Sequence, residues 1–155
     1  MNYKNNPVIY PGNKIGGNFI CGHFVLIREN NTIGNNVRIG SYTEIAHHVL
    51  IEDNVQIHSK CFISEFCRLK RGCWLGPGVY LINDKYPQTG GHYRKGCVIE
   101  EGAILGAGVR VMPGIIVGRE AIIGTGMTVT KDIPPEQVWI RGRYYTMRKE
   151  LEGYK

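Results

Sequence analysis

Aliphatic residues recur at every sixth position along most of the chain. Counting in sixes from Ile15 to Leu81 gives twelve positions, and only Cys21 among them is not aliphatic. This six-residue spacing of aliphatic residues, called the beat here, returns at Ile99 and continues to Val129. An isolated helix repeats its apolar positions every ~3.6 residues and a half-buried strand every second residue, so neither keeps this period. The pattern predicts a structural repeat.

A second set of small or apolar residues lies two positions before the beat, as with Val37 before Ile39 and Cys73 before Leu75. Side chains two apart on an extended segment point the same way, so each hexad directs two residues inward. Glycine often follows the beat, where we expect a bend between short strands. Each hexad therefore predicts one strand and one turn, and three hexads form a triangular coil of eighteen residues.

The beat is interrupted in the loop 82–98, where Pro87 and Tyr93 occupy two of its positions. Leu81 and Ile99 are eighteen residues apart, the length of one coil. We therefore expect the repeat to resume in phase after a loop no longer than the coil it replaces. A loop that breaks a repeat and keeps its register is a candidate functional segment.

The length of 155 residues fits one domain. Its predicted parts are a lead-in over 1–14, the repeat domain over 15–134 with the loop 82–98, and a tail over 135–155. Pro134 and Pro135 are expected to end the repeat, because proline does not donate to a strand ladder. Residues 144–152 predict a short carboxy-terminal helix.

Polar residues form one column at the coil period. His47, Glu65 and Asn83 are each eighteen residues apart, and Asp84 follows directly. Neighbouring rungs of a sheet lie about 4.8 Å apart, so these groups should gather within about 10 Å. The column predicts an acid-base site.

The hexads over residues 8–134 resemble the hexapeptide-repeat acyltransferases. The resemblance implies an all-β fold, a left-handed parallel β-helix of about seven triangular coils with one extruded loop and a short carboxy-terminal helix. Its handedness comes from the family, because ordinary parallel crossovers are right-handed. The segment 78–87 looks like the loop of bacterial N-acyltransferases for nucleotide-linked 3-amino sugars, of the dTDP-3-amino-3,6-dideoxyhexose and UDP-2-acetamido-3-amino-uronate types.

This resemblance implies a catalytic group of Asn83, Asp84, Glu65 and His58. The predicted substrate-binding group is His47, His48, Tyr86 and Ser59, of which the two histidines are titratable near neutral pH. No Ser-His-Asp arrangement is apparent, so the residues favour direct transfer. Asp84 or Glu65 is a candidate to orient the ammonium and accept its proton, and the choice between them stays open, as does uptake by the substrate or the thiolate.

The late coils resemble the family's coenzyme A groove, where small residues let the pantetheine arm approach the backbone. The predicted cofactor-binding residues are Gly106, Ala107, Gly124, Thr125, Lys131 and Arg141. The segment Gly142-Arg143-Tyr144-Tyr145 departs from the family's Gly-x-Pro-Ala run. The resemblance also implies a homotrimer with active sites between subunits.

The cysteine content and the net charge limit which ligands and binding partners are expected. Cys61, Cys67 and Cys73 are six apart and fall on three faces, which favours buried thiols over disulfides or a metal site, so no metal is expected. The net charge of +6 is scattered, which favours solvated surface or small anionic ligands over nucleic acid. No amino-terminal or other long apolar run is present, so we expect no signal peptide, no membrane span and a cytoplasmic location.

The sequence thus predicts an acetyl-CoA-dependent N-acetyltransferase that acts directly on the amine of a nucleotide-linked 3-amino-deoxysugar. One alternative is an O- or N-acetyltransferase for another sugar or small amine, and a second is a non-catalytic β-helix scaffold. A metal-dependent lyase resembling γ-type carbonic anhydrases needs three converging histidines. The spacing of His47, His48 and His58 does not resemble that site.

Overall fold

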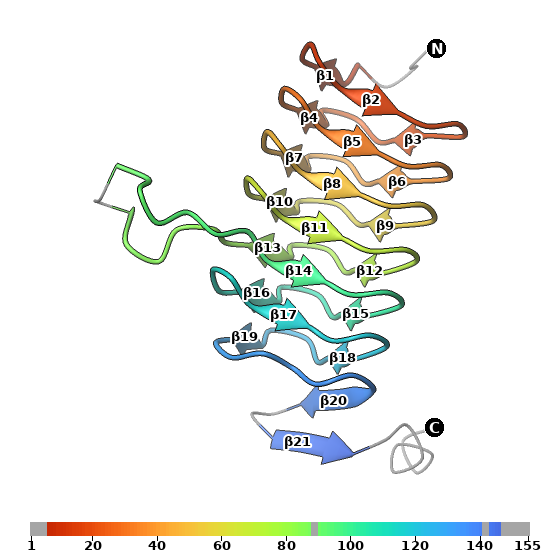
Figure 1. Ribbon diagram of the computed structural model, residues 1–155. Helices are drawn as coiled ribbons and strands as arrows, with labels where there is room; N and C mark the ends of the chain where they lie inside the picture. The colour runs from red at the N-terminus through yellow and green to blue at the C-terminus, as the bar shows by residue number, and fades with distance from the viewer. Residues whose placement is uncertain (1–5, 88–89, 141–142, 147–155) are drawn as a thin grey trace.

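The chain winds into a triangular solenoid of short parallel strands (Figure 1). The computed structural model describes residues 6–87, 90–140 and 143–146, the last of these for the backbone only. Within these residues three sheets, called sheets A, B and C here, contain seven, six and eight strands. The left-handed parallel β-helix of about seven coils that the hexads predicted is confirmed.

The strands of each sheet stack one per coil. Sheet A consists of β1 (Val8–Ile9), β4 (Leu26–Ile27), β7 (Glu44–Ile45), β10 (Phe62–Ile63), β13 (Tyr80–Leu81), β16 (Arg110–Val111) and β19 (Thr128–Val129). Sheet B consists of β2 (Lys14–Ile15), β5 (Thr32–Ile33), β8 (Leu50–Ile51), β11 (Arg68–Leu69), β14 (Val98–Ile99) and β17 (Ile116–Val117). Sheet C consists of β3 (Ile20–Cys21), β6 (Arg38–Ile39), β9 (Gln56–Ile57), β12 (Trp74–Leu75), β15 (Ile104–Leu105), β18 (Ile122–Ile123), β20 (Gln137–Ile140) and β21 (Arg143–Thr146).

The beat residues form the core. Ile45 pairs with Ile63 and Ile63 with Leu81, and all three are fully buried. Burying one such side chain contributes about 1.5–3 kcal/mol, so stacked beats hold successive coils in register. All five cysteines are free and buried. Burial raises the pKa of the Cys61 and Cys73 thiols.

The glycines that follow the beat are explained by contact between rungs. A Cβ on Gly76 would lie 2.7 Å from the backbone nitrogen of Ala107 in the next coil. The left-handed backbone position comes two residues after the beat glycine, where Asn36 has a φ of 57° and Gly78 a φ of 70°. Asparagine and glycine adopt that conformation most readily. The glycines that follow the beat are therefore required by the close packing of successive coils and not by the bend of the backbone.

Both ends of the solenoid extend beyond the predicted repeat domain. β1 lies inside the predicted lead-in over 1–14, and it pairs with β4 as part of the first coil. After Pro134 and Pro135 the chain forms β20, which pairs in parallel with β18, so the prolines occupy a turn and do not end the ladder.

The predicted helix over 144–152 is wrong where it can be compared, because residues 144–146 lie in β21, which pairs antiparallel with β20. The remainder of that segment lies outside the described residues. Among the residues described, none of the helical structure is long and apolar enough to cross a membrane.

The loop differs from the prediction in its register. Leu69 pairs with Ile99, thirty residues later, whereas other rungs, such as that of Ile63 and Leu81, are eighteen apart. Twelve residues are therefore inserted into one hexad between β13 and β14. The loop replaces no coil; it leaves the solenoid at one corner and returns to the same corner (Figure 1). The eighteen residues from Leu81 to Ile99 consist of the six of one ordinary hexad and the twelve of this insertion.

Deleting residues 84–95 should therefore leave the fold intact. The deletion joins Asn83 to Gly96 and restores the spacing of six between Leu81 and Ile99, and Gly96 already stacks on the backbone of Phe66. We expect an unchanged far-ultraviolet circular dichroism spectrum and a thermal midpoint within a few degrees of the parent. Loss of cooperative unfolding in the deletion variant would show that the insertion belongs to the folding unit.

Candidate active site

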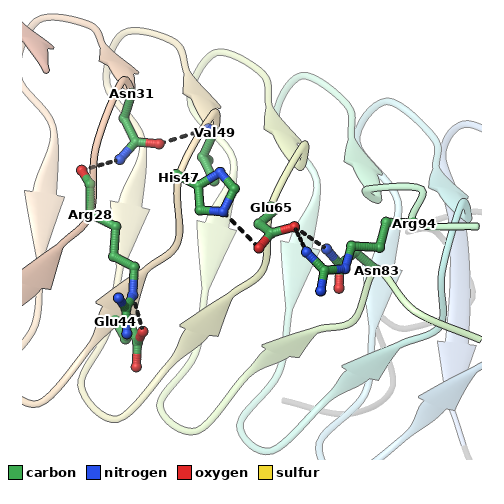
Figure 2. A network of polar contacts seen from close by, with 8 residues as sticks. All are labelled: Arg28, Asn31, Glu44, His47, Val49, Glu65, Asn83 and Arg94. Carbon is green, nitrogen blue, oxygen red and sulfur yellow. Dashed lines mark hydrogen bonds and ion pairs between the residues drawn. The ribbon is translucent and has the colours of Figure 1, made fainter. Parts of the chain in front are cut away.

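Glu65 is the centre of a polar cluster where the chain passes from sheet A to sheet B, called the A–B corner here. Its Oε1 lies 2.8 Å from His47 Nε2 and its Oε2 lies 2.7 Å from Arg94 Nη1. Asn83 Nδ2 lies 3.5 Å from the same Oε2. Figure 2 shows these side chains, drawn from three successive rungs and the loop, converging on one carboxylate. The predicted column of His47, Glu65 and Asn83 therefore comes together.

Asp84 lies beside the cluster at the start of the loop. Its Oδ1 accepts a hydrogen bond of 2.8 Å from the Tyr86 backbone N–H, which is an Asx turn. The loop closes on itself at its base, where Lys95 N–H donates to the Asn83 carbonyl at 2.8 Å. Asp84 is half-buried, whereas the Tyr86 side chain is 56% exposed. The turn fixes one carboxylate oxygen of Asp84 and leaves the other available to a ligand.

Glu65, Asn83, Asp84 and Arg94 line an open pocket of about 260 Å³, and His47 is not among its lining residues. Its lining residues are Ala46, Phe62, Ser64, Glu65, Asn83, Asp84, Pro87 and Arg94. His48 lies at the edge of the cluster, where it stacks on Phe66 with 5.9 Å between ring centroids. The pocket has one apolar wall from β10 and a charged wall from the corner and the loop.

Arg94 is the residue that the sequence reasoning missed. Its guanidinium packs over Gly91, where a Cβ would lie 2.6 Å from Nε. Gly91 has a φ of 86° and no side chain. The loop therefore leaves room at this position for the Arg94 side chain to reach Glu65. Treating the loop as a replaced coil hid this return, since only the true insertion brings Arg94 back to the corner. Glu65 is the carboxylate in the column of His47, Glu65 and Asn83. Its unbalanced charge was the available signal that a cationic side chain lies nearby.

His58 and Ser59 lie elsewhere. They belong to the corner between sheets C and A, the C–A corner, and the His58 ring contacts Trp74 with 4.7 Å between centroids. One side of the triangle separates them from Glu65, which is roughly 20 Å for six extended residues. Within one chain His58 and Ser59 therefore lie apart from Asn83 and Asp84, and their predicted roles stay predictions, because the active site that the resemblance implies lies between subunits.

Lys131 follows β19 at the A–B corner, whereas four of the predicted coenzyme residues, Gly106, Ala107, Gly124 and Thr125, lie at the C–A corner. Gly106 and Gly124 stack there, and a Cβ on Gly106 would lie 2.7 Å from the Thr125 backbone nitrogen. Coil packing alone thus explains these glycines. Lys131 lies over the Trp139 ring at 5.6 Å from the centroid, and Arg141 falls outside the described residues. In the described part of the chain, no group of three or more His, Cys, Asp or Glu side chains is arranged to hold a metal ion.

Comparisons with known proteins agree with this architecture. Residues 32–65 match the family described as bacterial transferase hexapeptide (six repeats), and residues 96–131 match the hexapeptide repeat of succinyl-transferase. A galactoside O-acetyltransferase of Lactococcus lactis is 41% identical over 70 residues, which is 41% of this chain and 34% of that protein. A putative acetyltransferase of Schizosaccharomyces pombe is 33% identical over 81 residues, 48% of this chain and 39% of that protein. The chain thus spans less than half the length of these relatives.

Solved structures share the fold at low identity. PerB from Caulobacter crescentus, determined with CoA and GDP-perosamine, has a TM-score of 0.61 and 24% identity, covering 91% of this chain and 57% of PerB. A mutant of AntD, an N-acyltransferase from Bacillus cereus, was determined with dTDP-4-amino-4,6-dideoxyglucose and coenzyme A. It has a TM-score of 0.57 and 20% identity, covering 96% of this chain and 83% of AntD. The repeat matches and the fold together identify the chain as a left-handed β-helix protein that carries the hexapeptide repeat of bacterial transferases.

Proposed function

We propose that the protein transfers an acetyl group from acetyl-CoA to the amine of an amino sugar at the A–B corner. The observation that carries the proposal is the carboxylate of Glu65, both of whose oxygens are occupied by His47, Arg94 and Asn83. A carboxylate held in this way orients its neighbours. The arrangement supports acid-base chemistry at a histidine.

His47 is the group best placed to accept a proton. With Nε2 donating its hydrogen to Glu65 at 2.8 Å, the lone pair of Nδ1 is free to act as a base. Glu65 fixes the tautomer and orientation of the ring, the role that a carboxylate plays behind many catalytic histidines. Glu65 is therefore a positioning residue here, because both of its oxygens engage neighbouring side chains.

The charge of the pocket favours an amine. Its charged lining groups are Glu65, Asp84 and Arg94, which sum to minus one with His47 neutral. A net negative pocket attracts an ammonium group before it is deprotonated. The oxygen of Asp84 that Tyr86 does not engage is the natural partner for that ammonium, and the Asn83 amide lies beside it.

The bound ammonium first releases one proton to solvent, and the transfer step from the neutral amine then balances with one base. The amine loses a proton to His47 as its nitrogen attacks the thioester carbon, the new C–N bond forms, and the C–S bond breaks. The thiolate leaves and takes up the proton. No covalent acyl-enzyme is required, and positioning of the two substrates provides much of the rate enhancement.

A second copy of the chain must complete this site if the donor binds at the C–A corner. Within one chain roughly 20 Å separates the corners, more than the reach of a reacting pair. A cyclic oligomer brings the A–B corner of one subunit to the C–A corner of the next. We therefore propose a homotrimer with the acceptor pocket on one subunit and Gly106, Ala107, Gly124 and Thr125 of its neighbour along the pantetheine arm.

The sugar class rests on two supports. The loop motif over 78–87 resembles enzymes for nucleotide-linked 3-amino sugars, and PerB and AntD were determined with nucleotide-linked amino sugars. The relative from Lactococcus lactis is an O-acetyltransferase, so a sugar hydroxyl is the second candidate acceptor. In that case the same histidine would deprotonate the hydroxyl.

Thiol release from acetyl-CoA should depend on a 3-amino sugar linked to dTDP or UDP. We expect His47→Gln to lower kcat at least about 100-fold, because it removes the base, and Glu65→Gln to lower it about tenfold by loosening that base. Glu52→Gln is the matched control, since it breaks an ion pair of 3.0 Å with Lys70 at another corner. Full activity of His47→Gln, or turnover confined to hydroxyl acceptors, would contradict the assignment.

Mixed oligomers test the shared site. His47→Gln removes the acceptor side and Thr125→Trp fills the donor side at an exposed position, so each variant alone should be inactive. Refolding an equal mixture should restore about a quarter of wild-type activity, because a quarter of cross-subunit sites then receive two intact corners. No recovery in mixtures that form oligomers would place both substrates on one chain.

A further inference from the structure

A polar groove crosses the outer face of sheet C near its amino-terminal end. It consists of two adjoining hollows of about 470 and 240 Å³, and both are lined by Ile20, Arg38 and Gln56. The larger hollow extends to the corner between sheets B and C, and the smaller reaches His58 and Ser59. The groove is separate from the acceptor pocket, which lies at the A–B corner.

Arg38 is the charge at the middle of this groove. It projects from β6 next to Gln56 of β9 in the neighbouring rung. Arg28, Arg94 and Arg119 each pair with a glutamate. Among the residues that the structure describes, no carboxylate lies within ion-pair distance of Arg38. The acid at the adjacent corner, Asp53, is engaged by the Asn35 backbone N–H at 2.7 Å.

An amide ladder along one wall ends in a free donor. Asn18 Nδ2 donates to Asn36 Oδ1 at 3.0 Å, and Asn36 Nδ2 donates to Asn54 Oδ1 at 3.1 Å. The next rung has Gly72 at this position, with nothing within 4 Å of an added Cβ. The amide nitrogen of Asn54 therefore meets open space instead of another acceptor.

We propose that this groove binds the phosphate of a small hydroxyl-bearing ligand, such as a nucleoside diphosphate or a sugar phosphate. A guanidinium offers paired N–H donors that match phosphate oxygens, and such charge-assisted bonds are stronger than neutral ones. The amides of Asn54 and Gln56 add donors beside it, and Ser59 offers a hydroxyl at the far end. This inference goes beyond the acetyl transfer proposed above and stands without it.

The proposal also accounts for a motif that the acceptor pocket leaves unused. His58 and Ser59 belong to the polar segment Gln56-Ile57-His58-Ser59-Lys60, and its first four members line the smaller hollow. Strand residues at the equivalent outward positions further along sheet C are apolar, namely Trp74, Ile104 and Ile122. Among these outward strand positions of sheet C, the polar residues thus lie in the part of the sheet that carries the groove.

Isothermal titration calorimetry with UDP, pyrophosphate and uridine tests the site on the full chain. We expect UDP and pyrophosphate to bind and uridine not to bind at 150 mM salt, a concentration that screens distant charges. Arg38→Gln should weaken UDP binding at least about tenfold, and Asn54→Ala about threefold. Arg68→Gln is the matched control, because Arg68 occupies the equivalent outward position on β11 of sheet B and is also exposed.

Three results would overturn the proposal. Equal weakening by Arg38→Gln and Arg68→Gln would indicate diffuse surface charge, and absence of UDP and pyrophosphate binding to the wild type would remove the site. A change in oligomeric state on Arg38→Gln, with phosphate binding unaffected, would make this face an interface between copies. Because no readout uses acetyl transfer, a failure here is distinct from a failure of the proposed activity.

Discussion

Parallel pairing of each coil with the next is the constraint on which the other features depend. The buried beat residues, such as Ile63 between Ile45 and Leu81, hold the rungs in a fixed register. That register also requires residues without side chains where backbones approach closely, as at Gly76 and Gly106. Because the strands β1 to β19 contribute only two residues each, corners make up most of every coil, and the acceptor pocket is built largely at one of them.

Because the register is fixed, residues one coil apart in the sequence stack in a column. Polar residues that are far apart in the sequence can therefore form one site. His47, Glu65 and Asn83 meet because each is one coil from the next, and Arg94 joins them because the loop returns to the corner it left. The same principle builds the ladder of Asn18, Asn36 and Asn54 on another corner. Corners are separate places: roughly 20 Å divides them, so residues close in sequence need not act together.

Much of the fold followed from the sequence because the six-residue beat has one simple geometric meaning. The column of His47, Glu65 and Asn83 followed from the same arithmetic. The insertion did not, since twelve added residues are a multiple of six and leave the phase of the beat after the loop unchanged. Arg94 was missed for that reason, and the corner that His58 occupies was not foreseen, because a motif read along the chain carries no information about which of three corners it occupies.

The ends of the repeat were also misjudged for physical reasons. Pro134 and Pro135 forbid ladder donation at their own positions, yet they fit a turn between Ile133, which bridges to Val117, and β20. Ile9 lies six residues before Ile15 and so continues the spacing, but the polar residues between them obscured it. Local propensity was overridden by pairing with an already formed neighbour, as is usual for strands.

We propose that acetyl transfer takes place at the A–B corner, with His47 as the base and a neighbouring chain supplying the donor groove. A crystal structure with coenzyme A and an unreactive acceptor analogue tests it most directly. The account predicts the thiol sulfur within about 5 Å of His47 Nδ1, with the pantetheine arm along Gly106 and Gly124 of another copy. Coenzyme bound with its sulfur more than about 10 Å from every A–B corner would contradict the account.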